Sequence, residues 1–134
     1  MRIELAEYRL NRAKDIVKES EDSLKQRHFA LSVNRSYYAM FTSARALLVL
    51  KEKDSSKHSG VIALFNQYII KPGIFPKEYS KFLREAKRIR EDADYGDFVE
   101  ITEEDAEIQL KNAKKFTEEA KRTMQRMITK AENG

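Results

Sequence analysis

The sequence contains no cysteine, and this absence excludes three kinds of site. Without a thiol the chain forms no disulfide framework, no thiolate metal site and no cysteine nucleophile. Glycine and proline are also scarce, with 4 and 2 residues among 134. An all-β fold needs turn residues about every ten positions, so this scarcity favours helices. A chain of this length folds as one domain, and we expect a single all-α domain over residues 1–134.

Long apolar runs are missing as well. The longest are short stretches such as residues 46–50 and 61–65, whereas a membrane span needs about 20 residues. The first residues open an amphipathic pattern that includes an acid, unlike a signal or transit peptide. Lysine and arginine total 26 against 22 acids, a net charge of +4, but the two signs are interspersed, which only weakly indicates nucleic-acid binding. We expect a soluble, cytoplasmic protein without a membrane segment.

Hydrophobic residues recur at steps of three and four along most of the chain, which is typical of amphipathic helices. In the first helix, Leu5, Tyr8 and Ile16 are expected to lie on the buried side. Gly96 is expected to end the fourth helix in the left-handed conformation, and Thr102 to cap the last one. The brief connections predict an up-and-down bundle. Its four long helices and one short helix are expected near residues 3–20, 26–52, 59–70, 76–95 and 103–130.

The second predicted helix is apolar around nearly its whole circumference. Such a helix must be covered on both sides, either as the central helix of the bundle or by a second copy of the chain, and the second alternative predicts a homodimer. One of its apolar stripes consists of Ala30, Val33, Tyr37, Phe41, Ala44 and Leu48. The opposite side consists of Leu31, Ala39, Ala46, Val49 and Leu50.

Two arginines occupy positions where the periodicity predicts apolar residues. Arg35 lies among the apolar residues of the second helix, and Arg90 lies within the apolar stripe of the fourth. Arg88, by contrast, points to the solvated side of the same helix. A partly desolvated guanidinium needs a negative partner, because an unpaired buried charge costs several kcal/mol. The sequence therefore predicts that something anionic meets Arg35 and Arg90.

The negative partner of these two arginines has two interpretations. In the first, Arg90, Asp94 and Tyr95 line a polar cleft that holds a phosphate or a ribose. In the second, Arg90 or Arg35 forms an internal salt bridge with Asp94 or Asp97 and locks the helix end. The periodicity leaves both open.

Two aromatic positions also allow a chemical and a structural interpretation. His58, at the start of the third predicted helix, either helps to bind an anion and acts as a base near pH 7, or serves as a capping or packing residue. Tyr37 and Tyr38 either stack on bases or pack in the core. The second histidine, His28, has no adjacent ligand at metal-binding spacing, so neither a metal nor a cofactor is expected.

Three separated segments together resemble the HEPN (higher eukaryotes and prokaryotes nucleotide-binding) domain family. They are NRSYYAMF at residues 34–41, KHSG at residues 57–60 and REDADYGD at residues 90–97. The resemblance covers almost the whole chain and implies a helical bundle that usually dimerises. It further implies a small prokaryotic protein, often encoded beside a minimal nucleotidyltransferase as its toxin or accessory partner.

Catalytic members of the family are metal-independent RNases with an arginine followed, four to six residues later, by a histidine. The resemblance identifies Arg90 as the motif arginine, but this sequence has no histidine after it. Asp94 and Tyr95 occupy the following positions, and the resemblance implies Tyr95 as a candidate for adenylylation by the partner. In the RNases the arginine stabilises charge on phosphorus and the histidine moves the proton of the 2′-hydroxyl.

Three hypotheses follow. The first is a nucleotide- or RNA-binding protein, or an accessory partner of a minimal nucleotidyltransferase in a toxin–antitoxin-like pair, without catalysis. Its anion-binding residues are Arg35, His58, Arg90, Asp94 and Tyr95. The second is a metal-independent endoribonuclease in which His58 supplies the base beside Arg90. In the third, the two arginines only lock the structure.

Overall fold

The computed structural model describes residues 2–134, which form five α-helices and no β-strand. The third α-helix continues into a five-residue π-helix, η1, so the short helix expected over residues 59–70 is α-helical only in its first part. The elements are α1 (Arg2–Lys25), α2 (Phe29–Val49), α3 (His58–Phe65), η1 (Asn66–Ile70), α4 (Glu78–Tyr95) and α5 (Glu103–Asn133).

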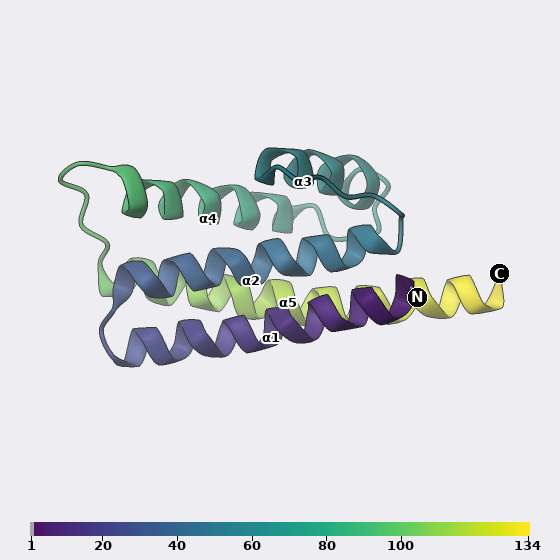
Figure 1. Cartoon of the computed structure of the whole chain (residues 1–134), viewed down its shortest axis with the longest axis horizontal. Helices are drawn as coiled ribbons and strands as arrows, with labels where there is room; N and C mark the ends of the chain where they lie inside the picture. The colour runs from purple at the N-terminus through teal and green to yellow at the C-terminus, as the bar shows by residue number, and fades with distance from the viewer. Residues whose placement is uncertain (1) are drawn as a thin grey trace.

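The four long helices lie along the same axis and alternate in direction from α1 to α2, α4 and α5 (Figure 1). The short α3 lies beside one end of this group, and the carboxyl end of α5 projects past the other helices (Figure 1). The predicted all-α, up-and-down bundle is therefore confirmed. None of the helices within residues 2–134 combines the length and the hydropathy that crossing a membrane would require.

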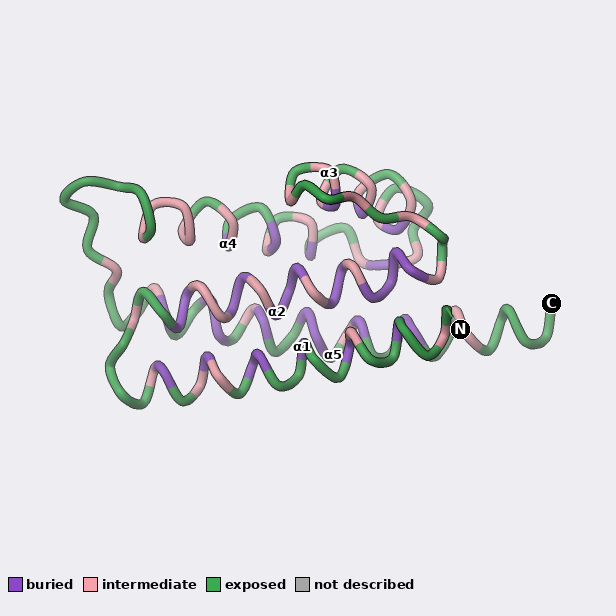
Figure 2. Tube along the Cα trace, viewed as in Figure 1, coloured by how far each residue is buried: buried purple, intermediate pink, exposed green. Residues whose placement is uncertain are grey.

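Helix α2 is the centre of the bundle. It contacts α1, α5, α4 and α3, and buried positions lie on both of its sides along most of its length (Figure 2). Tyr37 and Leu48 on one side, and Ala39 and Ala46 on the other, are completely buried. The chain itself therefore covers both sides of α2, and its doubly apolar character does not require a second copy.

Phe116 of α5 joins the parts of the core that are far apart in sequence. Its ring centroid lies 5.8 Å from that of Phe65 in α3, 5.1 Å from that of Phe75 in the following loop and 5.8 Å from that of Tyr79 in α4. All four side chains are buried. Aromatic pairs at these separations add to the free energy gained by burying their surface.

Buried hydroxyl groups join α1 to α2. Ser20 donates to the carbonyl oxygen of Ser32 at 2.9 Å, and Ser32 donates back to that of Ser20 at 3.0 Å. The hydroxyls of Ser20 and Ser36 are 2.8 Å apart. On the same helix, Ile16 is buried as expected, but the prediction for Leu5 and Tyr8 is wrong, because these side chains are 43% and 67% exposed.

The connection between α4 and α5 confirms one predicted helix end and corrects another. The hydroxyl of Thr102 accepts a hydrogen bond from the Asp105 amide, and the Asp105 carboxylate accepts one from the Thr102 amide, which together form a capping box. The expected left-handed Gly96 is wrong, since its φ is −80°. A Cβ atom at Gly96 would lie 2.6 Å from both the Asp92 carbonyl oxygen and the Val99 side chain, so close approach explains this glycine.

Replacing Phe116 by alanine should lower the free energy of unfolding by about 3–5 kcal/mol, because it empties the contact between α5, α3 and α4. Phe98→Ala is the matched control, since the Phe98 side chain is fully exposed, and it should change stability by less than about 0.5 kcal/mol. Urea denaturation measures both. Equal losses in the two variants would contradict this assignment of the core.

Candidate functional site

Arg90 lies on α4 against two aromatic rings of α2. Its guanidinium carbon is 5.0 Å from the ring centroid of Tyr37 and 5.6 Å from that of Tyr38. Its Nη1 donates to the Tyr38 hydroxyl and to the Asp94 carboxylate, each at 3.4 Å. The side chain is only 12% exposed, and its buried Nε has no hydrogen-bond partner within residues 2–134. Arg90 is thus desolvated and incompletely satisfied.

His58 approaches the same rings from the start of α3. Its Nδ1 lies 3.1 Å from the Tyr37 hydroxyl, and its ring centroid lies 4.4 Å from that of Phe41 and 5.6 Å from that of Tyr38. Lys57, rather than His58, is the N-cap residue of α3, so the capping interpretation is wrong and the packing interpretation is confirmed. The packed imidazole still lies near Arg90.

The environment of His58 favours a neutral imidazole. Burial lowers its pKa first, and the positive charges of Arg90, Lys87 and Arg45 lower the pKa further. Burial also raises the pKa of Tyr37, so its phenol keeps its proton at neutral pH. When the Tyr37 hydroxyl donates to Nδ1, that nitrogen accepts and Nε2 carries the imidazole proton.

Arg35 contacts the outer part of this group. Its guanidinium carbon lies 5.2 Å from the ring centroid of Tyr38, and its Nη1 lies 3.3 Å from a carboxylate oxygen of Glu19 on α1. Its side chain is 27% exposed, in agreement with the expected partial desolvation. The expected bridge to Asp94 or Asp97 is wrong for Arg35, because α1 packs against this side of α2 and supplies Glu19 instead.

We define the arginine–tyrosine cluster as Arg35, Tyr37, Tyr38, His58 and Arg90. Three helices supply it, and two guanidinium groups share the ring of Tyr38. Tyr37 is buried and Tyr38 is half-buried, so both tyrosines pack in the core as one interpretation predicted. Both also belong to the cluster, because the arginines lie on their rings.

The remaining predicted site residues differ in position. Asp94 pairs with Arg90, so the internal salt bridge expected for Arg90 is present. Tyr95 is 77% exposed and has no side-chain hydrogen bond or aromatic contact within residues 2–134. Lys87, one turn before Arg90, acts on His58 and was not predicted. Among the described residues, no three His, Asp or Glu side chains are arranged to hold a metal ion.

The model of the HEPN domain family matches residues 6–123 of the chain. The chain belongs to the HEPN domain family. This confirms the resemblance carried by the three segments. Together the segments contain all five residues of the arginine–tyrosine cluster.

Similar HEPN proteins occur in bacteria and archaea. A "UPF0332 protein" of Thermotoga maritima is 38% identical over 112 residues, which cover 84% of this chain and 85% of the relative. Two proteins of Methanocaldococcus jannaschii, each named "Putative toxin", are 32% identical over 142 and 126 aligned positions. These alignments cover 99% and 94% of this chain and 97% and 88% of the relatives.

Replacing Arg90 by glutamine should raise the pKa of His58, because it removes a positive charge that disfavours the protonated imidazole. Arg88→Gln is the matched control: Arg88 is 65% exposed on the same helix and pairs with Asp92 at 3.4 Å. An NMR titration of the His58 ring measures both variants. A pKa that shifts equally in the two variants, or in neither, would contradict the placement of Arg90 beside His58.

Proposed function

We propose that this HEPN protein is the toxin-like or accessory member of a pair with a minimal nucleotidyltransferase, acting as a cytoplasmic homodimer. Its arginine–tyrosine cluster binds the phosphate of a nucleotide or an RNA without cleaving it. The observation that carries the proposal is the desolvated Arg90 guanidinium, whose Nε has no partner within residues 2–134. The dimer and the nucleotidyltransferase rest on the family resemblance, and the "toxin" in the relatives' names supports the toxin-like role.

The position of the Arg90 guanidinium is well fixed, but its charge is only weakly neutralised. Both of its hydrogen bonds measure 3.4 Å, at the long end of the range, whereas charge-assisted bonds between nitrogen and carboxylate are usually about 2.7–2.9 Å. The rings of Tyr37 and Tyr38 fix the position of the guanidinium plane. A phosphate that offered shorter bonds would therefore replace the Asp94 contact without requiring Arg90 to move far.

The charges around the cluster support an anion of modest size. Arg35 adds a second guanidinium on the same ring, and part of its side chain remains exposed. Glu19 and Asp94 each neutralise one arginine, so an anion has to compete with a carboxylate at both positions. A terminal phosphate of a nucleotide has the advantage of a higher charge than a carboxylate. The oxygens of any phosphate, including one in an RNA backbone, match the guanidinium donors in pairs.

Replacing Arg90 by glutamine should weaken binding of a single-stranded RNA oligonucleotide about tenfold or more, because a desolvated charge-assisted contact is lost. Asp94→Asn should strengthen binding by up to about fivefold, because it removes the competing carboxylate. Arg88→Gln, paired in the same way with Asp92 on the solvated side, is the matched control and should change affinity less than twofold. Isothermal titration at fixed salt measures all three.

RNA affinity is expected to fall in Arg90→Gln and to rise in Asp94→Asn. These opposite changes distinguish an anion site from a salt bridge that only locks the structure. If the pair only locks α4, both variants should lose stability and neither should bind RNA more tightly. Weaker binding in both variants, or unchanged binding in both, would sink the proposed phosphate contact. Urea denaturation of the same variants identifies any loss of folded protein.

A second candidate function is a metal-independent endoribonuclease, and the position of His58 favours it. The sequence lacks a histidine after Arg90, but α3 brings His58 to the rings on which Arg90 lies. Its lowered pKa keeps the imidazole neutral near pH 7. In the tautomer whose Nδ1 donates to the Tyr37 hydroxyl, Nε2 is the nitrogen that accepts a proton from a 2′-hydroxyl. Arg90 would stabilise the charge that develops on the phosphorus oxygens.

RNA cleavage in the presence of EDTA decides between binding and catalysis. The endoribonuclease hypothesis predicts that His58→Ala and Arg90→Ala each lower the cleavage rate about a hundredfold or more. Arg88→Ala, purified in the same way, should retain full activity. Equal cleavage by all four proteins would point to a contaminating nuclease, and no cleavage by the unaltered protein would leave binding as the function of the cluster.

A further inference from the structure

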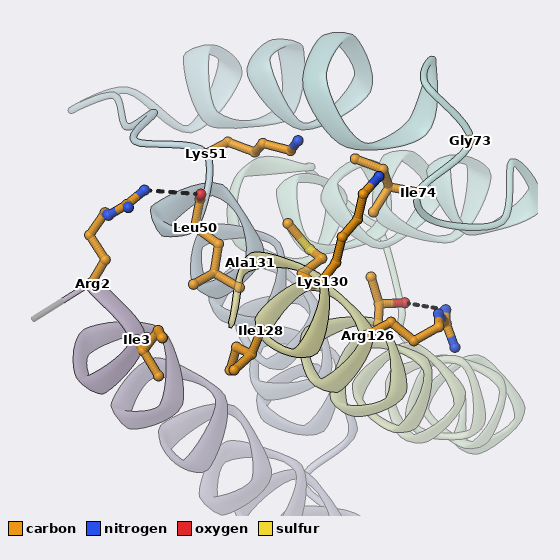
Figure 3. Close-up of a pocket in the computed structure, with 12 residues that line it drawn as sticks. Arg2, Ile3, Leu50, Lys51, Gly73, Ile74, Arg126, Ile128, Lys130 and Ala131 are labelled. Atoms are coloured by element: carbon orange, nitrogen blue, oxygen red, sulfur yellow. Dashed lines mark hydrogen bonds between the residues drawn. The ribbon is translucent and has the colours of Figure 1, made fainter. Parts of the chain in front are cut away.

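A pocket of about 440 Å³ lies at the end of the bundle (Figure 3), and none of its lining residues belongs to the arginine–tyrosine cluster. Four separate segments form it: the start of α1, the end of α2, the loop after η1 and the last turns of α5. Its volume falls within the range of about 300–1,000 Å³ that is usual for small-molecule sites. The projecting end of α5 forms one wall (Figure 3).

The inner surface of the pocket is aliphatic. Its apolar side chains come from all four segments: Ile3, Leu50, Ile74, Met127, Ile128 and Ala131. Its lining within residues 2–134 includes no aromatic ring and no acidic side chain. A nucleobase would therefore find neither a stacking partner nor a carboxylate to accept its amino groups, whereas an alkyl chain would gain from burial along the whole surface.

The rim of the pocket is cationic. Arg2, Lys51, Arg126 and Lys130 all line it, although the chain as a whole is nearly balanced, with 26 basic and 22 acidic residues. Within residues 2–134, Lys51 and Lys130 have no ion-pair partner, whereas Arg2 and Arg126 pair with glutamates at 3.6 and 3.4 Å. In Figure 3 the ammonium groups of Lys51 and Lys130 lie in the upper part of the pocket, above Leu50, Ile3 and Ile128, and that of Lys130 lies beside Ile74.

We propose that this pocket binds a medium- or long-chain carboxylate, with its alkyl chain against the aliphatic surface and its carboxylate between Lys51 and Lys130. Both halves of such a ligand match this pocket, whose lining within residues 2–134 combines six apolar side chains and two lysines without an ion-pair partner, with no carboxylate among them. A protein partner is a poorer match, because stable interfaces bury about 800 Å² on each side, far more than this hollow offers. The inference does not depend on the proposed function of the arginine–tyrosine cluster.

The test is a titration of the ¹⁵N-labelled protein with dodecanoate below its micelle concentration. Amide shifts should concentrate at the ends of α1, α2 and α5, and dodecanol and acetate should each bind much more weakly, because each lacks one half of the match. Lys130→Glu should weaken dodecanoate binding about fivefold or more. Lys121→Glu, on an exposed position of the same helix outside the pocket, should bind as the unaltered protein does.

Four results would overturn the proposal. They are shifts that concentrate at Arg90 and His58, equal binding of dodecanol, equal affinities of the two glutamate variants, and binding to vesicles of anionic phospholipid without any response to monomeric dodecanoate. The last result would identify a membrane-surface patch in place of a ligand pocket.

Discussion

Tyr37 belongs both to the hydrophobic core and to the arginine–tyrosine cluster, and the other contacts of the cluster depend on it. Its ring is fully buried and packs on Phe41, with centroids 5.7 Å apart. Its face receives Arg90, and its hydroxyl contacts His58. The hydroxyl of a buried tyrosine needs a hydrogen-bond partner. Burial of Tyr37 therefore depends on α3, which places the His58 imidazole beside that hydroxyl. Folding therefore assembles the cluster as part of completing the core.

Arg90 combines a structural and a chemical role for the same reason. It fills space between α4 and α2 and lies on two aromatic faces, which no shorter side chain would do. Its contacts are long and its Nε has no partner among residues 2–134, so hydrogen-bonding capacity nevertheless remains unused. Arg88, two residues earlier, is well solvated, so it neither fills space between the helices nor is desolvated as Arg90 is. The same type of ion pair, shifted by two residues along one helix, thus has a different chemical meaning on the two faces.

Periodicity in the sequence was enough to place the bundle, the doubly apolar character of α2 and the contrast between Arg88 and Arg90, because each depends on which face of a helix a residue occupies. It could not give the partner of Arg35, since Glu19 comes from a helix whose rotation against α2 is set by packing. Nor could spacing bring His58 to Arg90, because 32 positions separate them, including η1 and the loop that joins it to α4. Gly96 was misread for a related reason: its neighbour Val99 becomes close only after the loop folds.

The three hydroxyls between α1 and α2 have an effect beyond their own hydrogen bonds. Ser20 and Ser32 bond to each other's backbone, which holds the two helix axes close together. Glu19, the counter-ion of Arg35, is the residue immediately before Ser20. A bulkier residue at Ser20 or Ser36 would widen the gap and draw that carboxylate away. Arg35 would then lose its negative partner and keep its hydrogen bonds to the uncharged side chain of Asn34. Helix spacing at an uncharged, solvent-free contact thereby sets how strongly the outer arginine is neutralised, and evolution can adjust it without altering any charged residue.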